Sequence, residues 1–245
     1  QLVEIRNYLD PILKTQQYRT RKYIEEDFKK NNIFILGYKE LNERQKVWID
    51  NYFTTAIFPI LTPLAVDPAH PFPFISNLSL NLAAIIVDNE SDKQQFTRIK
   101  IPGESISRFI SIPIELHDNE STEYTGIAIE QIIANNLSML FPGMDVREYS
   151  FFRVTRDADL ELRDIEADDL MSALEEGLRK RRKGGEVVRL EVSINTPKII
   201  LDLLQEGMNI DKENLYQIEG LLALDELIEL TAFNLPKLKF KEHQG

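Results

Sequence analysis

The first thirty residues place apolar side chains three or four positions apart, which is the spacing of one helix face. A helix is therefore predicted over residues 1–31. Pro11 leaves two interpretations: Asp10 caps a second helix that begins at Pro11, or Pro11 kinks one long helix. The apolar stripe indicates a bundle whose other helices lie outside this chain. Its members are Leu2, Ile5, Leu9, Ile12, Tyr23, Ile24 and Phe28.

The segment from residue 33 to 73 combines a short strand, a capped helix and a stiff loop. Ile33–Leu36 is an extended apolar run, and Asn42 with Gln45 three residues later has the pattern of a capping box. The helix that begins there is predicted to stop before Pro59. Five of the eleven prolines fall between residues 59 and 73, so an ordered, stiff loop is predicted in that region.

From Leu78 onward the apolar positions alternate, which is the period of a strand. Short strands and helices then follow one another toward the end of the chain. Strands are predicted at 78–87, 96–101, 108–112, 149–155, 187–192 and 215–218, and helices at 127–140, 164–182, 198–206 and 221–230. This order predicts an α+β domain with a mixed sheet flanked by helices, preceded by the helical segment.

Composition and charge narrow the classes of function. The 245 residues are 43% hydrophobic and 28% charged, as in ordinary globular proteins, and include no cysteine. The net charge of −11 argues against broad binding of nucleic acid, which requires a basic face. No apolar run approaches the ~20 residues of a transmembrane segment, and the start lacks the features of a signal peptide.

Sequence motifs for metal or nucleotide chemistry are missing. His70, His117 and His243 are far apart and no HExxH occurs, so no metal site is predicted. His70 lies in a proline-rich segment and is interpreted as a structural histidine. There is no GxxxxGK[ST], GxGxxG or GxSxG motif. The sequence therefore nominates no catalytic residue.

Five arginines remain as candidates for contacts with phosphate or with another subunit. Arg179, Arg181 and Arg182 belong to a basic run at the end of a predicted helix, where cations also stabilise the helix dipole. Arg153 and Arg156 lie near the end of a predicted strand. Arg156 is interpreted first as a clamp on a carboxylate or on loop carbonyls, with phosphate contact as the alternative.

Four segments resemble the long, phosphohistidine-forming polyphosphate kinases. Residues 61–83 (LTPLAVDPAHPFPFISNLSLNLA) resemble the entry to the head domain of that family, and residues 151–162 (FFRVTRDADLEL) resemble a second head-domain signature. Residues 187–193 (VVRLEVS) are similar to a later strand, and residues 235–240 (LPKLKF) to the exit toward the first C-terminal domain. The order and spacing of these segments agree over nearly the whole chain.

The resemblance implies a four-domain enzyme that reversibly transfers the terminal phosphate of ATP to polyphosphate through a phosphohistidine, with magnesium. It assigns residues 1–32 to the end of the N-terminal helical domain, 33–234 to the head (middle) domain and 235–245 to the start of a linker to the first C-terminal catalytic domain. It also implies a homodimer, contacts with the flanking domains, and a cytoplasmic parent enzyme with peripheral membrane association as an alternative. ATP and Mg²⁺ are expected on the parent enzyme and not on this chain.

The nucleophilic histidine of the family lies in an HxK motif, which this chain does not contain. Its three histidines read HPF, HDN and HQG. A covalent mechanism needs a nucleophile, a base and an electrostatic clamp within a few ångströms, so no catalytic residue is carried over.

The favoured hypothesis is a non-catalytic portion of a polyphosphate kinase, which serves dimerisation and shapes the tunnel for nucleotide and polyphosphate. The alternative is a stand-alone acidic α+β interaction or ligand-binding domain, which an HxK motif encoded downstream of Gly245 would exclude. An independent enzyme built on Asp157 and Asp159 is disfavoured, because paired carboxylates need a shared cleft to shift their pKa values.

Overall fold

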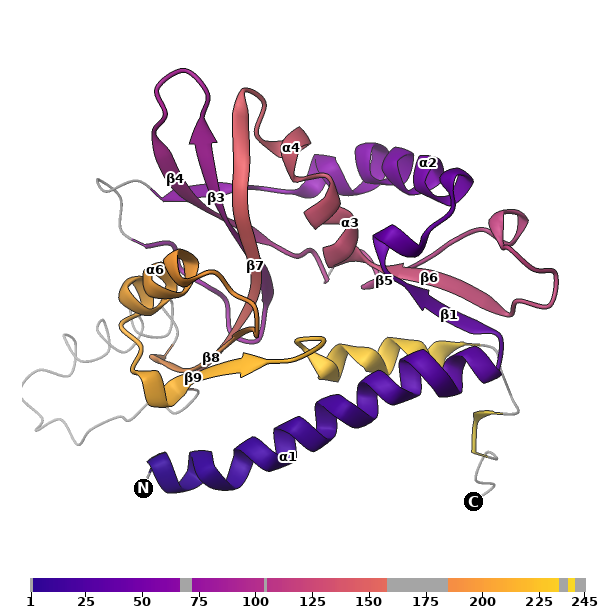
Figure 1. Ribbon diagram of the computed structural model, residues 1–245, viewed down its shortest axis with the longest axis horizontal. Helices are drawn as coiled ribbons and strands as arrows, with labels where there is room; N and C mark the ends of the chain where they lie inside the picture. Colours follow the sequence, from indigo (N-terminus) through magenta and orange to yellow (C-terminus); the bar gives the residue numbers. More distant parts are fainter. Residues whose placement is uncertain (1, 67–71, 104, 158–184, 234–237, 241–245) are drawn as a thin grey trace, which may run out of the picture.

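The chain folds around two β-sheets, with a long N-terminal helix along one side of the molecule (Figure 1). The computed structural model describes residues 2–66, 72–103, 105–157, 185–233 and 238–240. Within these residues the larger sheet has the strand order β2-β4-β3-β7-β8-β9, and the smaller sheet has the order β1-β6-β5. The predicted α+β class with a mixed sheet and flanking helices is confirmed.

The larger sheet is antiparallel except at one edge. Neighbouring strands from β2 to β8 pair antiparallel, and β9 joins β8 in parallel. β3 is buried along nearly its whole length because both faces of the sheet are covered. The strands are β1 (Ile33–Leu36), β2 (Leu64–Val66), β3 (Leu80–Asp88), β4 (Gln94–Lys100), β5 (Phe109–Ser111), β6 (Tyr124–Ala128), β7 (Met144–Arg156), β8 (Val187–Ser193) and β9 (Leu215–Ile218).

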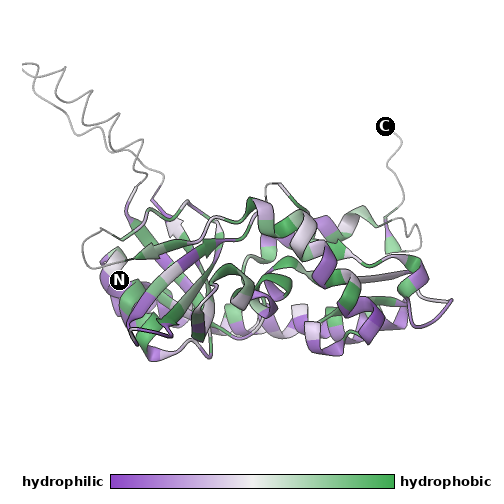
Figure 2. Cartoon of the chain, turned by 90° about the horizontal axis from the view of Figure 1, so that it is seen from above, coloured by the Kyte–Doolittle hydropathy of each residue, from purple (hydrophilic) through white to green (hydrophobic). Residues whose placement is uncertain are grey.

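Two apolar cores lie on opposite faces of the larger sheet. Successive side chains of a strand point to opposite faces, so Leu82 and Ile86 enter one core while Ala83 and Ile85 enter the other. Side chains of α2 and α3 join the first core and side chains of α6 join the second. Hydrophobic and hydrophilic residues both occur along the strands of the sheets (Figure 2). The α-helices are α1 (Leu2–Lys22), α2 (Glu43–Tyr52), α3 (Ile129–Asn135), α4 (Leu137–Leu140) and α6 (Lys198–Met208).

The smaller sheet contains a strand that the sequence did not predict. Its central strand, β6, pairs in parallel with β1 and antiparallel with β5. The helix predicted over 127–140 is wrong in its first residues, because Ile127 and Ala128 belong to β6. It is also divided into α3 and α4 at Asn136. The spacing of apolar residues favours a helix at Ile127 and Ala128. In the structure the backbone N–H and C=O groups of β6 are satisfied by pairing with strands distant in the sequence instead.

The N-terminal helix α1 is continuous through Pro11, so the interpretation of a second capped start is wrong. A π-helical turn, Tyr23–Phe28, continues it toward β1. No residue of α1 is buried, and several large apolar side chains on it are exposed. The prediction that α1 belongs to a larger bundle stays a prediction.

The predicted capping box begins α2. The Asn42 side chain accepts from the Gln45 N–H at 2.9 Å, and the Gln45 side chain accepts from the Asn42 N–H at 3.0 Å. Helical turns then continue to Ile60, past the predicted stop, because Pro59 occupies the first turn of a new 3-10 helix where its missing N–H costs nothing. The proline-rich loop is also not wholly irregular, since β2 lies within it and pairs with β4.

The C-terminal part departs from the prediction in the type of helix. The helix predicted over 221–230 is a 3-10 helix, η8 (Leu224–Ala232), preceded by Ala223 in the left-handed region with φ of 51°. α6 begins where predicted and runs two residues further, to Met208, where it is capped by Asn209, which is also left-handed with φ of 51°. The helix predicted over 164–182 lies outside the described residues.

Candidate functional site

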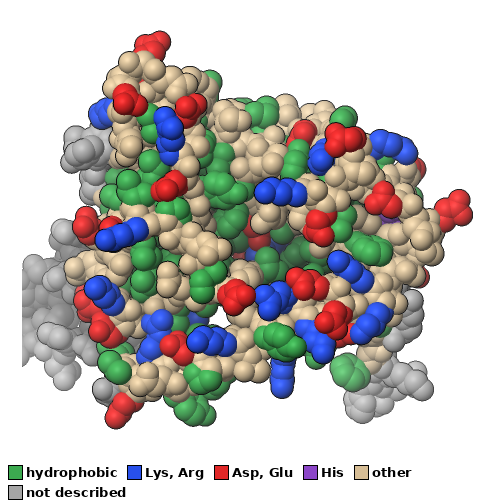
Figure 3. Space-filling view, viewed as in Figure 1, with side chains coloured by type: hydrophobic (Ala, Val, Ile, Leu, Met, Phe, Trp, Pro, Cys, Tyr) green, Lys and Arg blue, Asp and Glu red, His purple; other side chains and the backbone are tan. Residues whose placement is uncertain are grey.

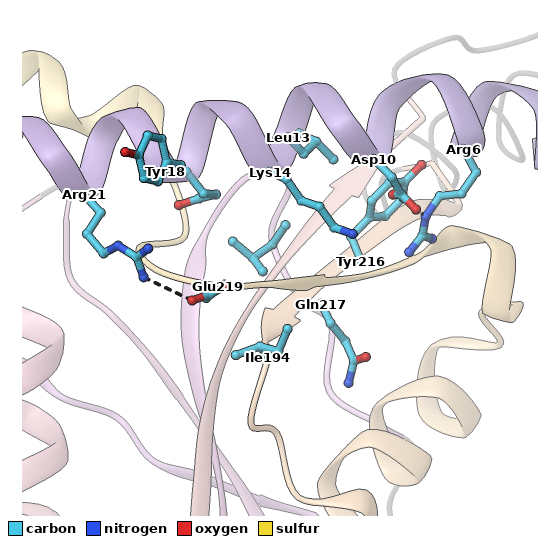
Figure 4. Close-up of a pocket in the computed structure, with 12 residues that line it drawn as sticks. Arg6, Asp10, Leu13, Lys14, Tyr18, Arg21, Ile194, Tyr216, Gln217 and Glu219 are labelled. Atoms are coloured by element: carbon cyan, nitrogen blue, oxygen red, sulfur yellow. Dashed lines mark hydrogen bonds and ion pairs between the residues drawn. The ribbon is translucent and has the colours of Figure 1, made fainter.

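A groove of about 410 Å³ separates α1 from strand β9, the parallel edge of the larger sheet (Figure 4). Leu13 and Ile218 extend from the first core to form part of its floor. Helix α1 reaches this edge with long polar side chains, so the two elements are held apart rather than packed directly. We call this the α1–β9 groove. It is lined by Arg6, Asp10, Leu13, Lys14, Gln17, Tyr18, Arg21, Ile194, Tyr216, Gln217, Ile218 and Glu219.

Arg6 and Tyr216 fix one end of the α1–β9 groove. The Arg6 guanidinium donates to the carbonyls of Glu213 and Leu215, and it pairs with Asp10 at 2.8 Å. It also lies over the Tyr216 ring, 3.9 Å from the centroid, while the Arg189 guanidinium lies 4.2 Å from the same centroid. Each guanidinium covers one face of the ring, so Tyr216 is held between two cations.

The backbone of β9 presents an open edge to the α1–β9 groove. The Ile194 N–H donates to the Ile218 carbonyl at 2.9 Å, so the backbone of Ile218 faces the β8 side. In a parallel ladder alternate residues face opposite edges, so the backbone N–H and C=O of Gln217 face outward toward α1. Arg6 binds the Leu215 carbonyl, which faces the same way.

Charged side chains line the rim of the groove, with three cations and two carboxylates. Arg21 pairs with Glu219 at 3.1 Å, and Arg6 pairs with Asp10. Lys14 makes no hydrogen bond or ion pair within the described part of the chain, and its side chain extends from α1 toward Tyr216 (Figure 4). Basic, acidic and apolar side chains alternate over the face that α1 occupies (Figure 3).

Arg153, a predicted contact residue, lies in a second cavity of about 380 Å³ beside the α1–β9 groove. Its guanidinium donates to the Leu78 carbonyl at 2.9 Å and pairs with Asp225 at 2.8 Å and Glu191 at 3.5 Å. Arg189 pairs with Glu191 at 2.6 Å in the same cavity. The two arginines and two carboxylates balance, so this cavity carries no excess charge for an anion.

Arg156 holds loop carbonyls together. It donates to the carbonyls of Ile75 and Gly185 at 2.7 and 2.8 Å, and it lies 4.3 Å from the centroid of the Phe74 ring. Burial lowers the pKa of Arg156. Arg156 thus binds loop carbonyls, as the first interpretation of this residue expects. The alternative, contact of Arg156 with phosphate, stays a prediction.

Three of the predicted contact residues, Arg179, Arg181 and Arg182, lie outside the described residues, as do His70 and His243. The ring of His117 is bonded at Nε2 to the Ile112 carbonyl at 3.0 Å. Within the described ranges no cluster of three or more His, Asp or Glu side chains is arranged to hold a metal ion. None of the helices in these ranges is both long and apolar enough to cross a bilayer.

The most buried charged group is one that sequence reasoning did not single out. Arg108, with 1% of its side chain exposed, binds Glu130 through two nitrogens, at 2.6 and 3.1 Å. It also donates to the carbonyls of Leu222 and Ala223 at 2.9 and 2.7 Å. Glu226 approaches it to 3.2 Å. We call this set of residues the Arg108 cluster.

The Arg108 cluster ties the smaller sheet to the segment that leads into η8. Burial opposes the charge of Arg108, but Glu130, Glu226 and Asp225 together outweigh burial and raise the pKa of Arg108. Burial raises the pKa of Glu226; the charge of Arg108 opposes this effect, and the charges of Glu130 and Asp225 add to it. An arginine at the start of an apolar strand was the only sequence signal, because the carbonyls that it binds lie more than a hundred residues away.

The fold and these contacts define a class: a mixed α+β domain in which Arg108, Arg153 and Arg156 hold distant segments together. A family model described as the polyphosphate kinase middle domain matches residues 44–230. The chain belongs to the polyphosphate kinase family.

Relatives in several organisms agree with this membership. The chain is 54% identical over its whole length to a polyphosphate kinase of Prochlorococcus marinus (strain MIT 9313), of which it covers 35%. It is 39% identical over 96% of its length to a polyphosphate kinase of Dictyostelium discoideum, of which it covers 22%. The chain thus spans about a third or less of the length of these curated relatives.

The fold is also that of a solved structure. The crystal structure of polyphosphate kinase from Porphyromonas gingivalis matches with a TM-score of 0.74 at 20% identity. The match covers 99% of this chain and 35% of that one. At this identity the structural match establishes the fold only. Membership of the family is established by the sequence matches described above.

Proposed function

We propose that the whole protein transfers the terminal phosphate of ATP reversibly to polyphosphate, through a phosphohistidine and with Mg²⁺. In this proposal the chain supplies a non-catalytic portion that serves dimerisation and shapes the tunnel for nucleotide and polyphosphate. The parent enzyme acts as a cytoplasmic homodimer. Residues 1–32 end the N-terminal domain, 33–234 form the head domain and 235–245 begin the linker.

One observation carries the proposal: the family model that matches residues 44–230 is that of the middle domain of a polyphosphate kinase. The contacts of three arginines also support a non-catalytic role for this chain. Arg108, Arg153 and Arg156 bind carbonyls and carboxylates of this chain, so these arginines have a structural role. None of the three histidines lies in an HxK motif.

Phosphate transfer is tested on the full-length protein and on the 245-residue chain side by side. With ATP labelled at the terminal phosphate and Mg²⁺ present, the full-length protein is expected to form acid-insoluble polyphosphate and an acid-labile phosphohistidine. The chain alone is expected to do neither. Label on His70 or His117 of the chain would overturn the non-catalytic assignment, and absence of polyphosphate from the full-length protein would overturn the proposed reaction.

The proposed dimer is tested by sedimentation of the full-length protein and of the chain. We expect a dimer for the full-length protein, and a dimer of the chain alone would place the contact on these residues. A monomeric full-length protein at micromolar concentration would contradict the proposed homodimer.

A further inference from the structure

A further groove lies between α6 and the outer strands β2 and β4 of the larger sheet, at the end of the molecule away from the smaller sheet (Figure 1). Its volume is about 520 Å³, and most of the side chains around it are apolar. We call it the α6–β4 groove. It is lined by Val66, Phe72, Ile85, Gln94, Gln95, Phe96, Ile199, Asp202, Leu203 and Glu206.

The apolar floor of the α6–β4 groove is held in place by close packing. Phe72 lies directly against α6 at Gly207, where a Cβ would overlap the ring. The Phe72 and Phe96 rings are 5.7 Å apart between their centroids. Ile199, from α6, is 41% exposed. A preformed hollow of this kind favours a partner that covers it, because burial removes apolar surface from water.

Asp202 and Glu206 give the α6–β4 groove an acidic wall. They are four residues apart on α6, so both lie on one face of the helix, and both are exposed. Neither carboxylate makes a hydrogen bond or an ion pair within the described part of the chain. Lys198 lies one turn earlier on the same helix, but it does not line the groove. The two carboxylates can therefore pair with cations of a partner without breaking a contact within the fold.

The backbone of β4 adds polar groups to the same groove. Strand β2 pairs with β4 only at residues 96–98, so the outer edge of β4 at Gln94 and Gln95 has no strand partner among the described residues. In an antiparallel strand alternate residues direct their N–H and C=O to opposite edges. One of these two residues therefore presents both backbone groups outward, where they can bond polar groups of an incoming segment.

The longest uninterrupted run of basic residues in the sequence, residues 179–183, has the complementary charge. The run follows Leu178 and lies outside the described residues. In the helix that the sequence predicts, Leu178 and Arg182 are four residues apart and share one face, as do Arg179 and Lys183. Such a segment offers an apolar side chain to the floor of the groove and cations to its two carboxylates.

A contact between two copies of this chain has to overcome their like charge. Each copy carries a net charge of −11, so the copies repel one another unless the contact joins regions of opposite sign. The acidic wall of the α6–β4 groove and the run at residues 179–183 are two such regions, and every copy carries both.

We propose that the α6–β4 groove is the surface on which a second copy of the chain docks, with residues 179–183 of that copy against Asp202 and Glu206. The inference rests on the homodimer proposed above and names the two surfaces that meet in it. Two-fold symmetry forms the contact twice, since the run of each copy reaches the groove of the other.

Exchange of charges tests this contact in the full-length protein. Asp202→Lys with Glu206→Lys reverses the charge of the groove, and Arg179→Glu with Arg182→Glu reverses that of the run. Each variant alone is expected to raise the dissociation constant of the dimer about tenfold or more in sedimentation equilibrium, because like charges then face each other. An equimolar mixture of the two variants is expected to dimerise like the unmodified protein, because both contacts of the mixed dimer join opposite charges.

The matched control for the groove variant is Glu115→Lys with Glu120→Lys. Both residues are exposed and lie between β5 and β6, at the other end of the molecule from α6 (Figure 1). This control changes the net charge by the same amount, and its dissociation constant is expected to equal that of the unmodified protein. It separates the contact from a general effect of net charge.

A groove variant that dimerises as well as the control would overturn the contact and leave the proposed homodimer standing. Two weakened variants whose mixture stays monomeric would also overturn it, because a contact between copies has to be restored by the exchange. A monomeric unmodified protein would refute the homodimer itself, and the contact with it. Restored dimerisation in the mixture alone supports the contact, since a run that bound the groove of its own chain, or a variant that failed to fold, would not be rescued by mixing.

Discussion

At the scale of single residues, the Arg108 cluster concentrates more buried charge than any other part of the described chain. Arg108 and Glu130 are 1% and 3% exposed, and the guanidinium binds carboxylates and carbonyls and also lies over the Phe109 ring. Charges removed from water in this way depend on each other, because either one alone has lost its hydration without gaining a partner.

Removal of Arg108 should therefore be costly. Arg108→Met is expected to lower the free energy of unfolding by about 3–5 kcal/mol, because Glu130 is left buried and unpaired. Urea unfolding followed by circular dichroism measures the change. Arg147→Met is the matched control, since Arg147 is 59% exposed and 4.0 Å from its partner, and its expected cost is within about 0.5 kcal/mol.

The double variant Arg108→Met with Glu130→Leu separates the two explanations of such a loss. It is expected to recover a large part of the stability, because two buried charges are exchanged for apolar packing. A double variant as unstable as Arg108→Met would contradict the role of the unpaired Glu130 charge.

Glu226 predicts a pH dependence of stability. Burial raises its pKa in the folded chain above the unfolded value of 4.5. The charges of Arg108 and Arg153 oppose this rise, whereas those of Glu130 and Asp225 add to it, and the net pKa stays raised. The folded state therefore binds the Glu226 proton more tightly. The resulting stabilisation is complete below pH 4.5 and is lost as the pH rises through the raised pKa.

Glu226→Gln removes this titration. Between pH 4.5 and 7 the melting temperature of the unmodified chain is expected to fall relative to that of the variant, and differential scanning calorimetry measures the difference. Glu206→Gln, on the exposed side of α6, is the control and should follow the unmodified chain. If the melting temperatures of all three proteins changed with pH in the same way, protonation of Glu226 would not be linked to stability.

At the scale of elements, the start of α2 was predicted correctly from a short sequence motif. Its capping box was predicted from Asn42 and Gln45, and both reciprocal bonds are present. The box needs no distant residue, because it satisfies orphan N–H groups within one turn of the chain. Tertiary structure adds two contacts: the Asn42 side chain donates to Asp118 at 2.7 Å, and the Gln45 side chain donates to the Leu116 carbonyl at 2.9 Å.

Loss of the cap should have a moderate cost. Asn42→Ala is expected to lower the free energy of unfolding by roughly 1 kcal/mol, within a range of about 0.5–2 kcal/mol for such changes. Asn42→Ser keeps an oxygen that can accept from the first turn, and it should lose clearly less. Chemical denaturation of the two variants gives the comparison, and equal losses would assign the effect to the Asp118 contact instead.

At the scale of the whole molecule, α1 is the least embedded large element. Its attachment to β9 and to the residues that flank this strand rests on Arg6, on Gln17, on the Arg21–Glu219 ion pair and on the apolar contact of Leu13, and none of its residues is buried. Elements with few buried contacts open at a low free energy, independently of the core. The position of α1 over the larger sheet therefore depends on a small number of polar bonds.

Arg6→Ala should detach the first part of α1 without unfolding the sheet. Hydrogen exchange is expected to become faster at residues 2–13, while amides of β3 and β7 keep their protection. Arg19→Ala, an exposed change on the same helix, controls for altered helix propensity. Uniform acceleration throughout the chain would show instead that α1 and the sheet open as one unit.

The sequence by itself determined what depends on short range. The family resemblance rests on contiguous segments such as residues 61–83, and the capping box and most strands follow from local spacing. The absence of an HxK motif was equally readable from the sequence.

The tertiary structure alone decided which distant residues meet. It placed Ile127 and Ala128 in β6 instead of the predicted helix, because Ile127 pairs with β1 about ninety residues earlier and Ala128 pairs with Phe109 of β5. It brought Arg108 to the carbonyls of Leu222 and Ala223, and it placed Lys14 opposite β9. Backbone pairing and burial are settled by the neighbours that the fold supplies, and no local pattern of apolar and polar positions contains those neighbours.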